Sequence, residues 1–193
     1  MIRALIVDDH PAVVSGLVGA LRSEPGLVPL GTASGLSAAL VEAARSAPNV
    51  ALIDYQLADG DGLQLCHKLK QLPAPPAVLI YSAFARRELA LAATVAGADG
   101  MVDKGSSLDE LFSAIWTVYR GDKALPPLHP DGLERSVSRL DPEDLPILGM
   151  RVDGATLPEI AAVLQLEERE LSRRLAAMLS RLAGDGSRGS ENG

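Results

Sequence analysis

Cysteine is nearly absent from this sequence of 193 residues, which contains only Cys66. A single cysteine cannot form an intramolecular disulfide or a zinc site built on several cysteines, and its scarcity fits a reducing compartment. The three histidines, His10, His67 and His129, share no spacing typical of a metal site, so we expect none of them to be a ligand. The sequence therefore excludes a disulfide-stabilised scaffold and suggests no zinc centre.

Long hydrophobic runs are also missing, and none approaches the ~20 apolar residues that a membrane-spanning helix needs. Met1 to Ile6 leads directly into strand-like sequence, without the pattern of a signal peptide. We therefore expect a cytoplasmic protein without a membrane partner. With 47% hydrophobic and 22% charged residues, the chain is long enough for one good core and a second, small one.

Positive charge is scarce, and the formal net charge is −7. Up to residue 130 there are 10 basic and 13 acidic residues, and beyond it there are 8 basic and 12 acidic residues. The two halves thus carry about −3 and −4, and neither resembles a nucleic-acid-binding domain by charge alone.

Strand-like and helix-like segments alternate through the first 120 residues. This alternation predicts an α/β fold with a doubly wound, five-stranded parallel sheet and right-handed crossovers. Such sheets bind ligands at the carboxyl ends of their strands. We expect strands at 2–7, 27–33, 50–53, 77–81 and 100–102, and helices at about 11–21, 34–46, 63–72, 86–96 and 108–119.

Polar residues follow four of the five predicted strands, namely Asp8 and Asp9, Asp54, Ser82 and Lys104. Taken alone, an Asp before a glycine-rich turn would most simply be a helix cap. Together, three carboxylates, a hydroxyl and an ammonium at one edge of a sheet favour a site for a hard divalent cation such as Mg²⁺ and a phosphate-like anion. With its charge neutralised, Asp54 could act as a nucleophile toward phosphorus.

Several motifs stand in the order typical of one family. Because of these motifs, residues 1–120 resemble the receiver domain of a two-component response regulator. The resemblance implies a flavodoxin-like fold and phosphorylation by a partner histidine kinase. It also implies no enzymatic activity beyond the domain's own phosphotransfer and slow dephosphorylation. The motifs are Val7-Asp8-Asp9-His10-Pro11, Asp54 followed by Gly62, Tyr81-Ser82-Ala83, and Gly97-Ala98-Asp99-Gly100 leading to Lys104.

The resemblance also assigns roles to the residues at the strand ends. It makes Asp54 the phosphoacceptor, and it implies that Asp9 and Asp54 bind Mg²⁺ with the backbone carbonyl of Gln56 while Asp8 acts through water. Ser82 and Lys104 would hold the phosphoryl oxygens.

One departure from the family pattern concerns the conformational switch. Met101 occupies the position of the aromatic residue that rotates inward when the hydroxyl residue moves toward the phosphate. Methionine is flexible and can fill the same gap, but it specifies no single orientation. We therefore expect phosphorylation to be retained and its transmission to be weaker.

A second unit is expected after a proline-rich linker at 121–139. Residues 140–183 predict three short helices, and the first should start near Asp144 because Pro146 fits only a first turn. Thr156 and Glu159 form a capping box for the second helix, and a leucine-rich stripe marks the third, at about 167–182. This segment resembles the LuxR-type (NarL/FixJ-like) helix-turn-helix, and residues 184–193 predict a disordered tail.

The LuxR-type resemblance implies promoter DNA as a partner, binding as a homodimer and a role in transcription. The apolar frame matches, but the surface that would read DNA does not, and Glu170 is placed to pair with two of its arginines. The alternative is a phosphorylation-gated module that binds a protein instead. The candidate DNA-contacting residues are Arg169, Ser172, Arg173, Arg174 and Ala176.

Overall fold

Five parallel strands form the central sheet, in the order β2-β1-β3-β6-β7. We describe residues 1–83, 87–128, 134 and 136–183 from a computed structural model. The doubly wound parallel sheet predicted from the alternation is confirmed, and every predicted strand is present. The strands are β1 (Ile2–Val7), β2 (Leu27–Ala33), β3 (Val50–Ile53), β6 (Ala77–Ser82) and β7 (Gly100–Asp103).

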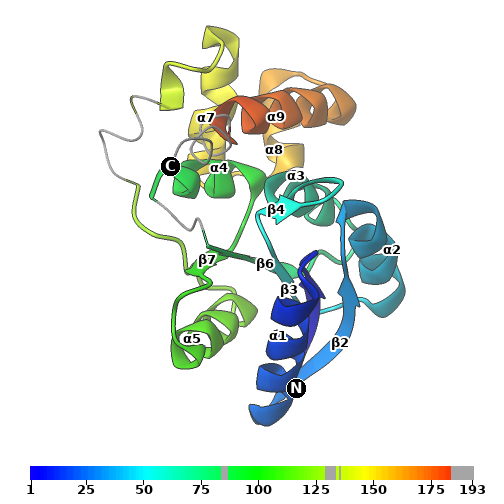
Figure 1. Cartoon of the computed structure of the whole chain (residues 1–193). Coiled ribbons are helices and arrows are strands. Elements are labelled where there is room, and N and C mark those ends of the chain that lie inside the picture. The colour runs from blue at the N-terminus through cyan, green and yellow to red at the C-terminus, as the bar shows by residue number, and fades with distance from the viewer. Residues whose placement is uncertain (84–86, 129–133, 135, 184–193) are drawn as a thin grey trace.

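Helices cover both faces of this sheet (Figure 1). Side chains of α1 (Pro11–Ser23) and α5 (Leu108–Tyr119) share one apolar cluster with alternate residues of the strands. Side chains of α2 (Leu36–Ser46), α3 (Gly62–Leu69) and α4 (Arg87–Ala96) share the other. Because β3 is covered on both sides, all four of its residues are buried, as its continuous apolar sequence predicts.

The glycine-rich turn after Asp54 contains a structure that the sequence pattern does not predict. Its residues form a two-stranded antiparallel hairpin, β4 (Gln56–Leu57) and β5 (Gly60–Asp61). Gly62 must be a glycine, because a Cβ there would lie 2.2 Å from the backbone oxygen of Asp54. The hairpin therefore folds tightly back onto the end of β3.

Three helices follow in the C-terminal part: α7 (Leu145–Val152), α8 (Leu157–Leu164) and α9 (Glu168–Ala183). A short 3₁₀ turn, η1 (Pro142–Asp144), precedes α7 and places Pro146 in the first turn of that helix. The carboxylate of Glu159 accepts hydrogen bonds from the backbone and hydroxyl of Thr156 at the start of α8. The three predicted helices are thus confirmed.

These helices pack on the receiver-like part of the chain, and α9 lies against α3 and α4 (Figure 1). One continuous apolar cluster joins the sheet to α3, α4 and the buried face of α9. Arg151 of α7 donates hydrogen bonds to the backbone oxygens of Val95 in α4 (3.0 Å) and Ala155 (2.8 Å). The buried apolar residues of α9 are Leu171, Leu175, Met178, Leu179 and Leu182.

The segment that leaves α5 is fixed to the sheet at its beginning. Ala124 bridges to Gly100, and its backbone exchanges hydrogen bonds with Met101 (2.9 Å) and Asp99 (2.8 Å). The predicted linker at 121–139 therefore starts along the edge strand β7. Residues 129–133 and the predicted tail at 184–193 lie outside the described residues. Within the described part of the chain, no helix has the length and apolar character to cross a membrane.

Candidate metal and phosphoryl site

The carboxyl ends of β1, β3 and β6 bring three polar side chains into the interior. Val7 of β1 is in register with Ile53 of β3, so Asp8 and Asp54 leave neighbouring strands at the same level. Only 3% of Asp8, 5% of Asp54 and none of Ser82 is exposed. Two buried carboxylates side by side repel each other, and the site therefore needs positive charge.

Lys104 supplies positive charge from the segment after β7. Its Nζ lies 2.6 Å from Asp8 Oδ2 and 2.8 Å from Asp54 Oδ2. Burial alone would lower the pKa of Lys104, but the hydrogen bonds that Lys104 donates to Asp54 and Asp8 outweigh it and raise that pKa above its ordinary value. The predicted convergence of Asp8, Asp54 and Lys104 at one edge of the sheet is therefore observed as direct contact.

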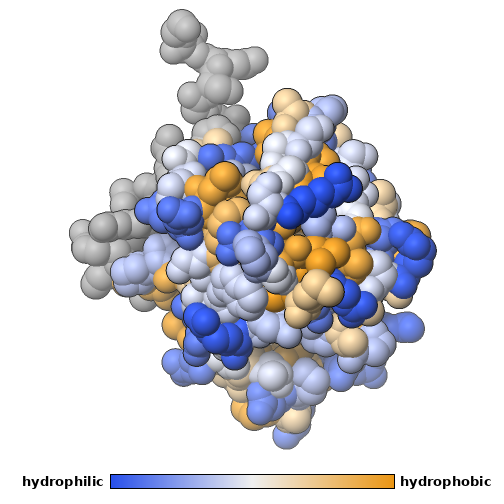
Figure 2. Space-filling view, turned by 90° about the horizontal axis from the view of Figure 1, so that it is seen from below, coloured by the Kyte–Doolittle hydropathy of each residue, from blue (hydrophilic) through white to orange (hydrophobic). Residues whose placement is uncertain are grey.

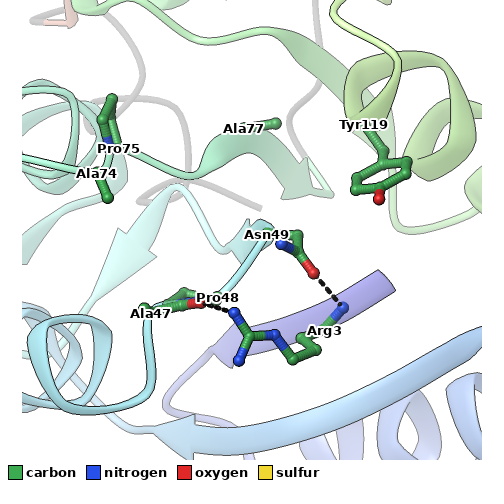
Figure 3. Close-up of a pocket in the computed structure, with 8 residues that line it drawn as sticks. All are labelled: Arg3, Ala47, Pro48, Asn49, Ala74, Pro75, Ala77 and Tyr119. Carbon is green, nitrogen blue, oxygen red and sulfur yellow. Dashed lines mark hydrogen bonds between the residues drawn. The ribbon is translucent and has the colours of Figure 1, made fainter. Parts of the chain in front are cut away.

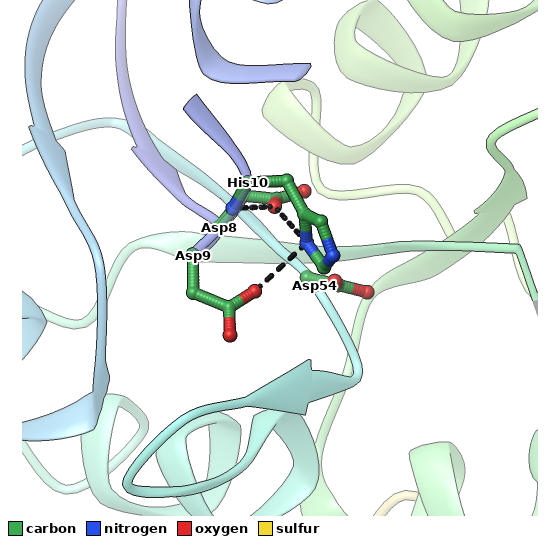
Figure 4. A group of neighbouring side chains, drawn as sticks. All are labelled: Asp8, Asp9, His10 and Asp54. Carbon is green, nitrogen blue, oxygen red and sulfur yellow. Dashed lines mark hydrogen bonds and ion pairs between the residues drawn. The ribbon is translucent and has the colours of Figure 1, made fainter. Parts of the chain in front are cut away.

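Asp9 completes an acidic cluster next to this pair (Figure 4). Its Oδ1 is buried and has no hydrogen bond of acceptable geometry among the described residues, although His10 Nδ1 lies 2.8 Å away. A buried carboxylate oxygen without a donor is costly unless it binds a cation. Ligand atoms of Asp8, Asp9, His10 and Asp54 all lie within 4.8 Å of one another, so this donor set fits a divalent cation.

His10 is the member of the cluster that the sequence analysis missed. Its Nδ1 lies 2.8 Å from Asp9 Oδ1 and 3.1 Å from Asp8 Oδ1 (Figure 4). The three histidines share no metal-like spacing with one another, and that spacing gave no sign of His10. The informative signal was the position of His10 directly after the Asp8-Asp9 pair.

The remaining candidates from the sequence lie around this centre. Asp54 is not a helix cap, because the cap of α3 is Asp61, whose side chain accepts from the backbone of Gln64 at 2.8 Å. Gln56 lies in β4, two residues beyond Asp54. Met101 is 7% exposed in β7 and packs in the same apolar cluster as α3 and α4, so its side chain is part of the core.

The candidate DNA-contacting residues of α9 are only partly free. Ser172 and Ala176 are half-buried, and the backbone oxygen of Ala176 accepts from Gln64 Nε2 of α3 at 3.2 Å. The predicted competition from Glu170 is confirmed, because its carboxylate pairs with both Arg173 and Arg174. Arg169 and Arg173 are exposed. One part of the face predicted to read DNA thus contacts the receiver-like part of the chain, and the other part is exposed to solvent.

His67 of α3 is buried beside the same face of α9. Burial, together with the nearby charges of Arg151 and Lys68, lowers its pKa to about 4, although the backbone of Ser172 acts in the opposite direction. His67 is therefore neutral at pH 7, and the contact between α3 and α9 adds no buried positive charge at this point.

A shallow pocket of about 400 Å³ lies at the opposite edge of the sheet, where the strands begin (Figure 3). Arg3 lines it, but its side chain donates to the Ala47 oxygen at 2.7 Å and its backbone to Asn49 Oδ1 at 2.9 Å. Because Arg3 and Asn49 are used in these hydrogen bonds, the polar groups of this pocket serve local structure. The view from below shows apolar patches separated by hydrophilic side chains (Figure 2).

Comparison with known families identifies the part of the chain that carries the acidic cluster. Residues 4–116 match the family model of the response regulator receiver domain. The chain belongs to this family. The resemblance inferred from the motifs is thereby confirmed, and Asp8, Asp9 and Asp54 all lie within the matched residues.

Relatives of this response regulator match over nearly its whole length. It is 29% identical to the DNA-binding transcriptional activator DevR/DosR of Mycobacterium tuberculosis, with 94% of this chain and 88% of the relative covered. It is 28% identical to the response regulator UvrY of Escherichia coli K12, with the same coverage. The receiver and the helical C-terminal part are therefore both included in the similarity.

Solved structures of response regulators share the fold. One is a LuxR-family two-component response regulator from Aurantimonas sp. SI85-9A1, which is 28% identical, with a TM-score of 0.62 over 69% of this chain and 94% of that one. Another is the response regulator RcsB in complex with DNA, at 21% identity and a TM-score of 0.62 over 94% of this chain and 91% of that one. The second likeness supports the fold alone.

Proposed function

We propose that this response regulator accepts a phosphoryl group on Asp54 from a partner histidine kinase and thereby controls transcription in the cytoplasm. The observation that carries the proposal is the bridge from Lys104 to the buried carboxylates of Asp8 and Asp54. Lys104 offsets negative charge at Asp54 Oδ2, and the carboxylate keeps an oxygen lone pair for nucleophilic attack.

The chemistry follows from the residues that surround Asp54. Its carboxylate oxygen attacks phosphorus, a new oxygen–phosphorus bond forms, and the bond from phosphorus to the donor's histidine nitrogen breaks. Lys104 then pairs with a phosphoryl oxygen, and the buried Ser82 hydroxyl holds another. Asp8, Asp9, Asp54 and the Gln56 carbonyl are the groups that would hold Mg²⁺, which when bound neutralises charge on the transferring group.

The test uses the full-length protein with Mg²⁺ and a small phosphodonor in place of the kinase. We expect a base-labile phosphoryl label on the wild type and none on Asp54→Ala, because an acyl phosphate is base-labile and this variant lacks the carboxylate that would form it. Asp61→Ala is the matched control, since Asp61 caps α3 beside the site and should leave the label intact. A label that survives in Asp54→Ala would refute the assignment.

For the output, we propose that residues 1–120 form the receiver, 121–139 the linker and 140–183 a LuxR-type helix-turn-helix that binds promoter DNA as a homodimer. The exposed arginines Arg169 and Arg173 support contacts to phosphates or guanine edges. The packing of α9 on α3 implies that phosphorylation has to release this helix before it can enter a groove.

One observation favours a second candidate, a module that binds a protein rather than DNA. Glu170 neutralises Arg173 and Arg174, and the small residues Ser172 and Ala176 pack toward a protein helix in this structure. In this alternative, α9 would leave the receiver after phosphorylation and bind another protein. Specific DNA affinity separates the two candidates.

A further inference from the structure

We propose that His10 supplies a nitrogen ligand to the cation at the phosphoacceptor site, which makes the site prefer transition-metal ions over Mg²⁺ more strongly than a site with oxygen ligands alone. The inference deepens the proposed function, on which it rests, because it concerns the identity of the ion that Asp8, Asp9 and Asp54 hold.

The distances between His10 and the two carboxylates match those between ligands of one cation. Neighbouring ligands of an octahedral cation that lie 2.0–2.1 Å from the metal are about 3 Å apart. His10 Nδ1 lies 2.8 Å from Asp9 Oδ1 and 3.1 Å from Asp8 Oδ1. The imidazole nitrogen therefore already stands at the separation that two adjacent ligands of one cation adopt.

One proton on His10 Nδ1 cannot fully satisfy both neighbouring carboxylates. Nδ1 of a neutral imidazole carries at most one proton, so it can form a well-aligned hydrogen bond with only one of Asp8 and Asp9. The contact with Asp8 has hydrogen-bond geometry, whereas Asp9 Oδ1 remains buried without a donor. A cation between the three atoms would use all three lone pairs, because each ligand atom would then face positive charge.

The local backbone holds His10 in this place. Its N–H donates to Asp8 Oδ1 at 2.8 Å, and the next residue, Pro11, begins α1. The ring of Pro11 clashes with an α-helical residue before it and so restricts His10 to extended conformations, and His10 has φ −96° and ψ 106°. The side chain, which is 66% exposed, reaches the cluster from its solvent side.

The chemical consequence is selectivity. Mg²⁺ prefers oxygen ligands, whereas imidazole nitrogen strengthens binding of first-row transition metals in the order Mn²⁺, Co²⁺, Ni²⁺ and beyond. Loss of His10 should therefore weaken Mn²⁺ and Co²⁺ binding about tenfold or more and Mg²⁺ binding by less than about threefold.

The experiment measures metal binding by the full-length protein without phosphodonor, using Mn²⁺, Co²⁺ and Mg²⁺ alone as probes. Calorimetry gives the three affinities, and pulsed electron paramagnetic resonance of bound Mn²⁺ detects a directly coordinated nitrogen. We expect the nitrogen coupling in the wild type and in Ser15→Ala, a control at an exposed position of α1, and its loss in His10→Ala.

The outcomes separate this inference from the proposed function. Bound Mn²⁺ without nitrogen coupling, or equal losses of Mg²⁺ and Mn²⁺ affinity in His10→Ala, would overturn the role of His10 and leave the site intact. Tighter metal binding by His10→Ala would also overturn it, because His10 would then compete with the ion. Full metal affinity in Asp54→Ala would instead remove the site on which both proposals stand.

Discussion

Among single residues, Lys104 has the most demanding position, because it alone of the described lysines touches both buried carboxylates of the site. The sequence pattern was sufficient to predict this neighbourhood. Asp8, Asp54 and Lys104 each follow a strand, and parallel strands end at one edge. The sequence pattern could not predict that His10 joins the cluster, because the position of an imidazole relative to two carboxylates depends on side-chain rotamers and on the start of α1.

We expect Lys104→Met to lower the free energy of unfolding by about 3 kcal/mol at pH 8, because it leaves two buried carboxylates without their cation. Since folding raises the pKa of Lys104, its contribution is complete below the unfolded value of about 10.4 and is lost as pH rises beyond the folded value. Urea unfolding of both proteins from pH 8 to 11 should show the difference shrinking at the alkaline end.

The double variant Lys104→Met/Asp54→Asn is the control for this prediction. It removes one carboxylate together with the cation, so it should recover much of the lost stability. Equal stability of wild type and Lys104→Met at pH 8 would mean that the carboxylates are neutralised in another way.

At the scale of helices and strands, sequence signals at element ends were reliable. Pro11 begins α1, and the predicted capping box of Thr156 and Glu159 forms at the start of α8. The pattern was less informative where tertiary contacts decide, as in the β4–β5 hairpin, whose two-residue strands are too short to show a period of two. The predicted helix at 63–72 ends earlier, at Leu69, because local turn hydrogen bonds from Gln71 to Lys68 and from Leu72 to Leu69 replace the helical pattern.

Gly97, directly after α4, has a position that no other residue fits without strain. Its φ is +91°, and an added Cβ would lie 2.6 Å from the Arg151 guanidinium that holds α4 to α7. We expect Gly97→Ala to lower the free energy of unfolding by about 1–3 kcal/mol, through backbone strain and displacement of Arg151. Thermal unfolding of the purified variant would measure this loss.

Gly19→Ala is the matched control for this substitution. Gly19 lies inside α1 with nothing within 4 Å of an added Cβ, so alanine should stabilise the protein by about 0.5–1 kcal/mol through helix propensity. If Gly97→Ala unfolded at the wild-type temperature, the contact between α4 and α7 would not contribute to stability.

For the whole molecule, the decisive feature is the packing of α9 on α3 and α4. The leucine stripe of α9 predicted a buried face, but the same stripe would serve a separate three-helix bundle equally well. The pattern therefore indicated three helices and left their docking surface open. That surface depends on residues far away in the chain, such as Gln64, which donates to Ala176 and Ser180.

This docking predicts how DNA binding should depend on phosphorylation and on Gln64. Because α9 is held by α3, we expect the wild type to bind genomic fragments weakly, and a phosphodonor to raise its affinity about tenfold. Gln64→Ala removes two hydrogen bonds to α9, so it should raise the affinity without phosphodonor. Fragment binding at two salt concentrations measures both effects.

The variant Arg169→Ala/Arg173→Ala tests whether the released helix reads DNA. Both arginines are exposed, so their loss should leave the fold intact and weaken binding, with a smaller dependence on salt because fewer phosphates are neutralised. Specific binding that is lost in this variant would establish the transcriptional output. If neither phosphodonor nor Gln64→Ala produced specific binding, the result would favour the protein-binding alternative for α9, in which Glu170 neutralises Arg173 and Arg174.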